Sequence, residues 1–251
     1  MLNAKTNRMH EAALSYTLAF VRQNLPLARA KILEVGAGRG ELACALQESG
    51  YEVVAVEANA EAAEASRKLG VTTHCAHWPE FAVATESFDA VLFTRALHHI
   101  SPLPEALQHA RTALRVGGRV VIEDFCHEGV NARELAWFAG VVRLLVTCGA
   151  LAQKPSWLHS FVQSSDPVSV WRAEHDHDLH PCAAMLNATC AVFGNVKSER
   201  CAYYFRYLNE AWQHEALLQL CSNAFLQMEE AMIAAQMIAP LGCRIVAEKL
   251  A

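Results

Sequence analysis

The sequence predicts an α/β protein built on a doubly wound, mostly parallel sheet with helices on both faces. Two observations support this. Short runs rich in β-branched residues alternate with helix-prone runs over residues 31–125, as expected for right-handed strand–helix–strand units. After residue 125 the chain becomes helix-prone and aromatic, and a strand-like run at 243–249 follows. We therefore also expect a helical cap and an antiparallel closing strand.

The N-terminal segment, residues 1–30, is expected to form a helix. Its apolar residues repeat at spacings of 4, 3 and 4 between Leu14 and Leu25, which places them on one helix face. The segment also resembles a signal peptide in its apolar run after basic residues. Glu11 and Arg22 interrupt that run and favour the helix.

The core, residues 31–125, is expected to contain five strands and the helices between them. Asn59 is suited to cap the start of one helix and Gly70 to end it. Another helix has prolines at its start and glycines beyond its end, the usual asymmetry. We expect strands at 31–35, 51–57, 71–76, 88–94 and 119–124, and helices at 40–50, 59–70 and 102–118.

Two further segments complete the predicted organisation. Residues 126–190 are expected to form a helical cap or insert, whose aromatic residues line a pocket or make a second core. Residues 191–251 are expected to add strands and a helix that complete the sheet. Within this last segment, 194–208 resembles a strand and a helix-prone stretch extends to about residue 238.

The composition limits the expected binding partners and the expected cellular location of the protein. The 251 residues are 53% hydrophobic and 19% charged, so the chain can bury a large core. The net charge is −5 and no run of Lys or Arg is present, which argues against a nucleic-acid partner. No apolar run reaches the length of a membrane span, so we expect no membrane partner. Nine cysteines without a CxxC pair indicate reduced thiols and a cytoplasmic protein.

The glycine-rich stretch at 31–46, KILEVGAGRGELACAL, lies between a predicted strand and a predicted helix. Such a loop lets the backbone approach a ligand closely. No Lys–Ser/Thr pair follows Gly40, which excludes a P-loop. Gly36, Gly38 and Gly40 read G-x-G-x-G, and Glu41 occupies the place of the third glycine of the dinucleotide fingerprint. A pyrophosphate would meet a carboxylate there, which is unfavourable.

Carboxylates around this loop suit a cationic ligand instead. Glu34 precedes the glycines, and Glu57 ends the second predicted strand about twenty residues further on. An acidic residue at that second position can accept hydrogen bonds from both hydroxyls of a ribose. A ribose, a positively charged amino-acid end and no phosphate together describe S-adenosylmethionine.

Four stretches resemble the successive motifs of class I S-adenosylmethionine-dependent methyltransferases. They read ILEVGAGRGELACAL, VVAVEAN, SFDAVLFTRALHHI and LRVGGRVVIEDF, and cover residues 30–125. The resemblance implies a Rossmann-like fold, the cofactor S-adenosylmethionine, a methionine-end contact from Glu34 and a ribose contact from Glu57. The cofactor-binding residues expected from it are Glu34, Gly36, Ala37, Gly38, Gly40, Glu57, Ala58, His77, Trp78, Thr94 and Arg95.

The contact to adenine departs from the family pattern. Relatives often carry an acidic residue after the third strand, and here His77 and Trp78 stand at that place. His77 could bond the adenine amino group and Trp78 could cover the ring face. Alternatively, Trp78 simply packs at the edge of the core.

His98 and His99 follow the fourth predicted strand and are the candidate catalytic residues. Open α/β sheets bind ligands at the carboxyl ends of their strands, and imidazole titrates near neutrality. Either histidine could therefore take a proton or orient the acceptor. The alternative is a structural loop whose histidines pack or contact the cofactor.

The segment 174–182, EHDHDLHPC, gathers His175, His177, His180 and Cys182. These are zinc ligands by type. Their spacing matches no usual zinc-site pattern, and the interleaved acids suit a solvated segment. We therefore expect no metal site.

The expected activity is methyl transfer to an O or N atom of a small-molecule acceptor. Two alternatives stay open: an NAD-dependent oxidoreductase on a related sheet, and an inactive cofactor-binding regulator or partner subunit. Protein acceptors also remain open, as does a homodimer.

Overall fold

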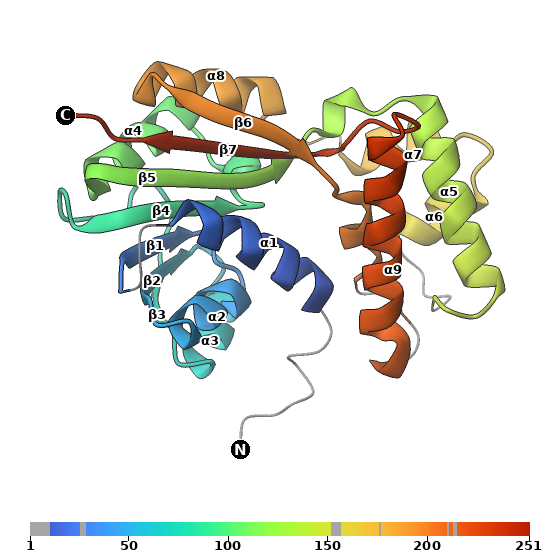
Figure 1. The fold of residues 1–251 in the computed structure, drawn as a ribbon, viewed down its shortest axis with the longest axis horizontal. Helices are drawn as coiled ribbons and strands as arrows, with labels where there is room; N and C mark the ends of the chain where they lie inside the picture. The colour runs from blue at the N-terminus through green and yellow to red at the C-terminus, as the bar shows by residue number, and fades with distance from the viewer. Residues whose placement is uncertain (1–10, 26–28, 152–156, 176, 210, 213–214) are drawn as a thin grey trace. The chain divides into compact units, whose positions relative to one another are not determined.

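The computed structural model describes residues 11–25, 29–151, 157–175, 177–209, 211–212 and 215–251. The chain divides into two compact units, coloured along the sequence in Figure 1. The sheet unit comprises Leu14–Phe125, His180–Glu199 and Cys243–Ala251; the helical unit comprises Met1–Ala13, Cys126–Leu179 and Arg200–Gly242.

Seven strands form one sheet in the order β3-β2-β1-β4-β5-β7-β6. The pairs from β3 to β5 are parallel. The closing strand β7 is antiparallel to β5, because Gly117 donates its N–H to the carbonyl of Lys249 and Lys249 donates back to Gly118. This confirms the predicted fold class. The strands are β1 (Lys31–Val35), β2 (Glu52–Glu57), β3 (Thr72–Cys75), β4 (Phe88–Thr94), β5 (Leu114–Phe125), β6 (Val196–Cys201) and β7 (Gly242–Glu248).

The helices of the sheet unit bury apolar faces against these strands. Phe20 of α1 and Leu46 of α2 belong to the same core cluster as Leu92 of β4, so one face of the sheet is covered by both helices. Helix α4 packs beside α8. Asn59 caps α3 as predicted, accepting the N–H of Ala62. The helices are α1 (Glu11–Asn24), α2 (Glu41–Glu48), α3 (Ala60–Lys68), α4 (Leu103–Ala113) and α8 (Cys182–Phe193), with a 3₁₀ turn η1 (Leu97–His99).

A buried ion pair fastens α1 to the sheet. Glu123 of β5 is fully buried and accepts hydrogen bonds from Thr17 of α1 and from the Arg244 guanidinium of β7. That guanidinium also lies over the rings of Tyr16 and Phe20. The buried carboxylate is thus paired and hydrogen-bonded, which compensates for its desolvation.

The helical unit has an aromatic core of its own. Phe138 of α5 and Tyr204 are buried, with ring centroids 5.0 Å apart. The ring of Phe161 also packs against that of Phe138. Edge-to-face and tilted aromatic pairs of this kind stabilise a core beyond the area that they bury. The elements are η2 (His127–Gly129), α5 (Ala132–Thr147), α6 (Trp157–Gln163), α7 (Pro167–Glu174), η3 (Tyr204–Leu208) and α9 (Glu215–Ala234).

The strand predicted over 194–208 is shorter than expected. It ends at Cys201, and a 3₁₀ turn follows from Tyr204. The carboxylate of Glu229, on α9, accepts the backbone N–H groups of Tyr203, Tyr204 and Phe205. Backbone donors that a continuing strand would give to a neighbouring strand are therefore taken by one side chain. Burial raises the pKa of Glu229 to about 7, although these hydrogen bonds lower it.

Within the described part of the chain, no helix combines the length and apolarity needed to cross a membrane. The nine cysteines, all within the described residues, form no disulfide bonds.

Candidate active site

A cavity of about 520 Å³ lies in the sheet unit at the carboxyl ends of β1, β2 and β4. This is the edge at which open parallel sheets bind ligands, and the volume suits a small molecule or cofactor. The structure thus brings together residues from three of the four motifs, and none of LRVGGRVVIEDF lines the cavity. Seven predicted site residues line the cavity: Gly36, Glu57, Ala58, His77, Trp78, Arg95 and His99.

The remaining six predicted residues are outside this lining. They are held in the loops and strand ends next to it, and several of them support residues that do line it, as described below. These residues are Glu34, Ala37, Gly38, Gly40, Thr94 and His98.

The glycine loop is shaped by close contacts. A Cβ atom added to Gly36 would lie 2.4 Å from the Cβ of Ala96, and Gly36 has a φ of +68°. Gly40 has a φ of +83° at the N-cap of α2, and a Cβ there would meet the side chain of Ser66. Positive φ and tight space both require glycine at these two positions. Gly38 is different, because it has a φ of +56° but open space around it.

Glu57 connects the glycine loop after β1 with the turn after β2. Its Oε2 accepts the N–H of Gly38 at 2.7 Å, and its Oε1 accepts the N–H of Asn59 at 2.8 Å. Each carboxylate oxygen can accept more than one hydrogen bond. The side chain can therefore orient the loops and still accept the two hydroxyls of a ribose.

Glu34 is almost completely buried near the end of β1. Its Oε1 accepts a hydrogen bond from Thr94 at 3.3 Å, and its Oε2 has no partner among the described residues. Burial raises the pKa of this carboxyl to about 8, against smaller lowering effects of Thr94 and Arg95. A buried acceptor without a partner is costly. A ligand ammonium would supply the missing charge and donors, so the residues present fit the amino-acid end of S-adenosylmethionine.

Trp78 lines the cavity, yet most of it is packed. Its Nε1 donates to the carbonyl of Ala106 at 3.0 Å, and its ring lies 4.3 Å from that of His109. Only 7% of the residue is exposed. These contacts agree with the packing interpretation of Trp78. The neighbouring His77 is exposed, so more of its surface is accessible to a ligand.

Arg95 turns the chain at the cavity. It is a non-glycine residue with a φ of +56°, held by its N–H donating to the carbonyl of Glu123 at 2.7 Å. Such conformations store local strain and concentrate at functional sites. The turn directs the chain from β4 into η1, which carries both candidate histidines.

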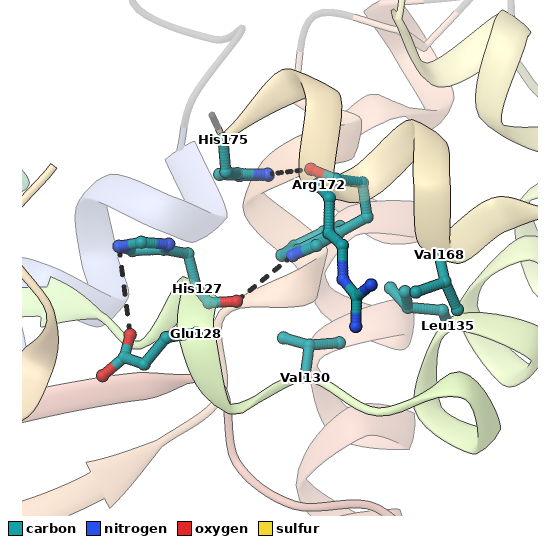
Figure 2. Close-up of a pocket in the computed structure, with 8 residues that line it drawn as sticks. His127, Glu128, Val130, Leu135, Val168, Arg172 and His175 are labelled. Carbon is teal, nitrogen blue, oxygen red and sulfur yellow. Dashed lines mark hydrogen bonds and ion pairs between the residues drawn. The ribbon is translucent and has the colours of Figure 1, made fainter. Parts of the chain in front are cut away.

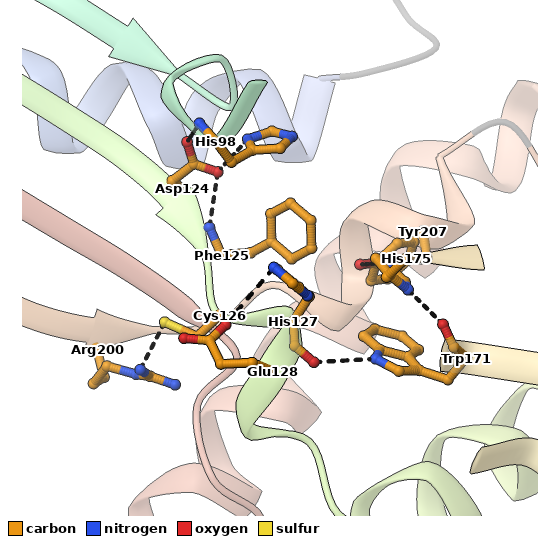
Figure 3. Close-up of polar contacts among 10 residues, drawn as sticks. All are labelled: His98, Asp124, Phe125, Cys126, His127, Glu128, Trp171, His175, Arg200 and Tyr207. Atoms are coloured by element: carbon orange, nitrogen blue, oxygen red, sulfur yellow. Dashed lines mark hydrogen bonds and ion pairs between the residues drawn. The ribbon is translucent and has the colours of Figure 1, made fainter. Parts of the chain in front are cut away.

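His98, in η1 after β4, and Asp124, near the end of β5, form a buried pair (Figure 3). Nδ1 of His98 lies 2.7 Å from Oδ1 of Asp124. The carboxylate is itself fixed, because Oδ1 accepts the N–H of Phe125 at 3.0 Å and Oδ2 accepts the N–H of His98 at 3.3 Å. His99 is exposed, lines the cavity and has its ring centroid 4.0 Å from that of His98.

Asp124 is absent from the residues predicted for the site. It stands at the carboxyl end of the fifth predicted strand, next to the fourth, and parallel neighbours end at the same edge of a sheet. The position of Asp124 at the end of the motif LRVGGRVVIEDF could therefore have predicted its proximity to His98. Ser101 and Glu105, at the start of α4, also line the cavity without having been predicted.

The histidine-rich segment is held by protein contacts. Nε2 of His180 lies 2.9 Å from the hydroxyl of Ser101 and 3.0 Å from the carbonyl of Ile100. Its backbone N–H donates to the carbonyl of His98, so His180 supports the loop that carries the candidate base. His175, in the helical unit, bonds Trp171 and Tyr207. Asp176 lies outside the described residues.

Comparison with known proteins decides the family. The family model described as a methyltransferase domain matches residues 7–174, about two thirds of the chain. The chain belongs to this family. The resemblance to class I S-adenosylmethionine-dependent methyltransferases is thereby confirmed, together with the enzyme class and the cofactor. The alternative of an NAD-dependent oxidoreductase is overturned.

Individual relatives add detail about this methyltransferase. It is 39% identical over 102 residues to protein-L-isoaspartate O-methyltransferase of Methylorubrum populi, a match covering 37% of this chain and 43% of that protein. A relative from Methylorubrum extorquens matches in the same way. The chain thus spans less than half the length of these curated relatives.

Solved structures share the fold of the methyltransferase at low identity. An S-adenosylmethionine-dependent methyltransferase from Thermotoga maritima superposes with a TM-score of 0.55 and 15% identity, over 96% of this chain and 91% of that one. Phosphoethanolamine N-methyltransferase 2 of Haemonchus contortus, in complex with S-adenosylmethionine, gives a TM-score of 0.60 and 15% identity, over 94% and 53%.

Proposed function

We propose that this methyltransferase modifies an O or N atom of a small-molecule acceptor, and that His98 accepts the proton released. The observation that carries the proposal is the buried His98–Asp124 pair, beside a cavity lined by the neighbouring His99. A proton acceptor is useful when the attacking atom is a hydroxyl or a protonated amine.

The residues proposed to bind the cofactor lie in or next to the same cavity. When bound, S-adenosylmethionine supplies an electrophilic methyl group. Glu34 would face its ammonium group, the loop from Gly36 to Gly40 would bring the backbone close to it, and Glu57 would accept the ribose hydroxyls. Arg95 and His77 would contact it from the cavity lining.

Asp124 gives His98 a defined role. A carboxylate 2.7 Å from Nδ1 favours a proton on that nitrogen electrostatically, although the two atoms are not aligned as a hydrogen bond. The lone pair is then on Nε2, the nitrogen that can take a proton. Asp124 thereby orients the imidazole, and it acts as a positioning residue for His98.

A second candidate is methylation of a protein carboxyl group. The curated relatives from two Methylorubrum species are named protein-L-isoaspartate O-methyltransferases. The match covers only 37% of this chain, so more than half of the chain has no counterpart in that alignment. We therefore keep the small-molecule acceptor as the first proposal.

An acceptor screen separates the two candidates. The purified protein would be incubated with methyl-labelled S-adenosylmethionine and a panel of small amines, phenols and carboxylic acids, with an isoaspartyl peptide as the protein-type acceptor. Mass spectrometry identifies the methylated product. Label on a small amine or phenol supports the proposal, and label confined to the peptide overturns it.

Single substitutions then test the base. His98→Gln is expected to lower kcat strongly, whereas His99→Gln should change mainly KM, because His99 lines the cavity at its exposed side. Undiminished turnover of the His98→Gln variant would show that positioning alone accounts for the reaction.

A further inference from the structure

A second cavity, of about 370 Å³, lies entirely within the helical unit (Figure 2). It is enclosed by η2, the first turn of α5 and one side of α7. Its volume is in the range of small-molecule sites. The residues lining it are His127, Glu128, Val130, Leu135, Val168, Trp171, Arg172 and His175.

The cavity has an apolar wall. Leu135 and Trp171 are buried, and Val130 and Val168 are half-buried and keep part of their surface in the cavity. Apolar surface in contact with water is unfavourable by about 25 cal/mol per Å². An apolar ligand body would remove that contact.

A guanidinium group lies beside this wall. Figure 2 shows the Arg172 side chain extending between Val130 and the pair formed by Val168 and Leu135. Among the described residues the guanidinium has no hydrogen bond or ion pair. The guanidinium lowers the pKa of Asp166 only slightly, because hydrogen bonds from Ser169 are the main cause of that lowering. The charge is therefore available to a ligand.

The other polar groups of the cavity already serve the protein (Figure 3). Trp171 donates its Nε1–H to the carbonyl of His127 at 3.3 Å. Nδ1 of His175 lies 2.8 Å from the carbonyl of Trp171 and must donate to it, so Nε2 accepts from the hydroxyl of Tyr207 at 3.2 Å. Glu128 lies 3.9 Å from Nε2 of His127. These hydrogen bonds hold the walls in place. Glu128 is an exposed carboxylate that pairs with His127 only when that histidine is protonated, so Arg172 is the lining group with a permanent positive charge.

We infer that this cavity binds a small apolar carboxylic acid. The carboxylate pairs with the guanidinium of Arg172, whose fork geometry matches two carboxylate oxygens. The apolar body lies against Val130, Leu135 and Val168. The inference goes beyond the proposed methyl transfer and does not depend on it, because the binding needs neither cofactor nor turnover.

Calorimetric titration of the full chain without cofactor tests the inference. The probe is 3-phenylpropionate, and its amide is the neutral counterpart of equal shape. Arg172→Gln should weaken binding of the acid by about tenfold or more, as expected for loss of a charge-assisted pair. The matched control is Arg133→Gln, since Arg133 is an exposed arginine on α5 outside the lining; it should bind the acid as the unaltered protein does.

A second variant alters the apolar wall of the cavity. Val168→Glu places a carboxylate in the wall and should also abolish binding of the acid. Circular dichroism and unchanged S-adenosylmethionine affinity would show that each variant is folded, independently of the cavity. Equal binding of the acid and the amide, equal losses in the Arg172 and Arg133 variants, or no binding by the unaltered protein would each overturn the inference.

Discussion

Nδ1 of His98 and Oδ1 of Asp124 lie 2.7 Å apart, and both residues are buried. They come from the loop after β4 and from β5, two neighbouring parallel strands. The carboxylate is fixed by two backbone N–H groups, so it cannot rotate away without losing them. The pair combines an oriented imidazole with a nearby cavity, and it is the arrangement on which the first prediction depends.

Asp124→Asn is expected to lower kcat by about a hundredfold. The amide can present its NH₂ group to Nδ1, which favours the tautomer with the proton on Nε2 and removes the base. The affinity for S-adenosylmethionine should stay within a factor of about three, because Asp124 is absent from the cavity lining. Steady-state kinetics and cofactor titration measure both quantities.

Asp89→Asn is the matched control. Asp89 begins β4 at the opposite end of the sheet, where it accepts hydrogen bonds from Lys31 and Arg115. This variant should lose some stability and keep its kcat. Equal losses of kcat in both variants would mean that Asp124 acts only through the fold.

Glu34→Gln is expected to stabilise the cofactor-free protein, increasingly so from about pH 5 to about pH 8. The carboxyl ionises near its ordinary pKa of 4.5 in the unfolded chain, whereas burial raises its pKa to about 8 in the folded one. The folded state holds the proton over this window, so raising the pH favours unfolding of the unaltered protein. Gln does not titrate. Urea unfolding at several pH values measures the difference, and parallel curves would contradict it.

The same residue should release a proton when the cofactor binds. A ligand ammonium beside Glu34 lowers the pKa of the carboxyl, so binding near pH 7 should release roughly one proton in the unaltered protein. Calorimetry in buffers of different ionisation enthalpy measures that number. In Glu34→Gln the release should vanish and the affinity should fall. Unchanged proton release would show that another group titrates.

Glu57→Ala is expected to weaken S-adenosylmethionine binding by roughly tenfold to a hundredfold. The substitution removes the acceptors for Gly38 and Asn59 as well as those proposed for the ribose. Glu61→Ala, on the exposed face of α3, controls for the loss of negative charge and should bind normally. Unchanged affinity of the Glu57 variant would place the ribose elsewhere.

Gly36→Ala and Gly38→Ala separate crowding from backbone strain. Both glycines have positive φ, but an added Cβ clashes with Ala96 only at Gly36. We expect a loss of about 1 kcal/mol in unfolding free energy for Gly38→Ala and roughly 2–4 kcal/mol for Gly36→Ala. Chemical denaturation measures both. A reversed order would mean that Ala96 moves aside.

Removal of metal should leave activity unchanged. Both ring nitrogens of His175 and Nε2 of His180 already contact protein atoms, which leaves only Nδ1 of His180 among these four nitrogens for a metal. Dialysis against a chelator, followed by metal analysis and an activity assay, is the measurement. Activity that is lost on dialysis and restored by Zn²⁺ would contradict the prediction.

Much of the fold and the cofactor loop was determined by sequence alone. Strand and helix periods are local properties, so the five core strands and the cap at Asn59 could be predicted from the order of residues. The same holds for the spacing of Gly36, Gly38 and Glu57. These features depend on residues close together along the chain or on one repeated unit.

Only the tertiary structure decided which distant groups meet. The pairing of His98 with Asp124 depends on β4 and β5 being neighbours, and the raised pKa of Glu34 depends on its burial. The strand ends at Cys201 because Glu229, far along the chain, takes the next backbone donors. The role proposed for the Arg172 guanidinium depends on the apolar side chains that the fold places beside it. Desolvation and hydrogen-bond partnership are properties of packing, and a linear pattern does not contain them.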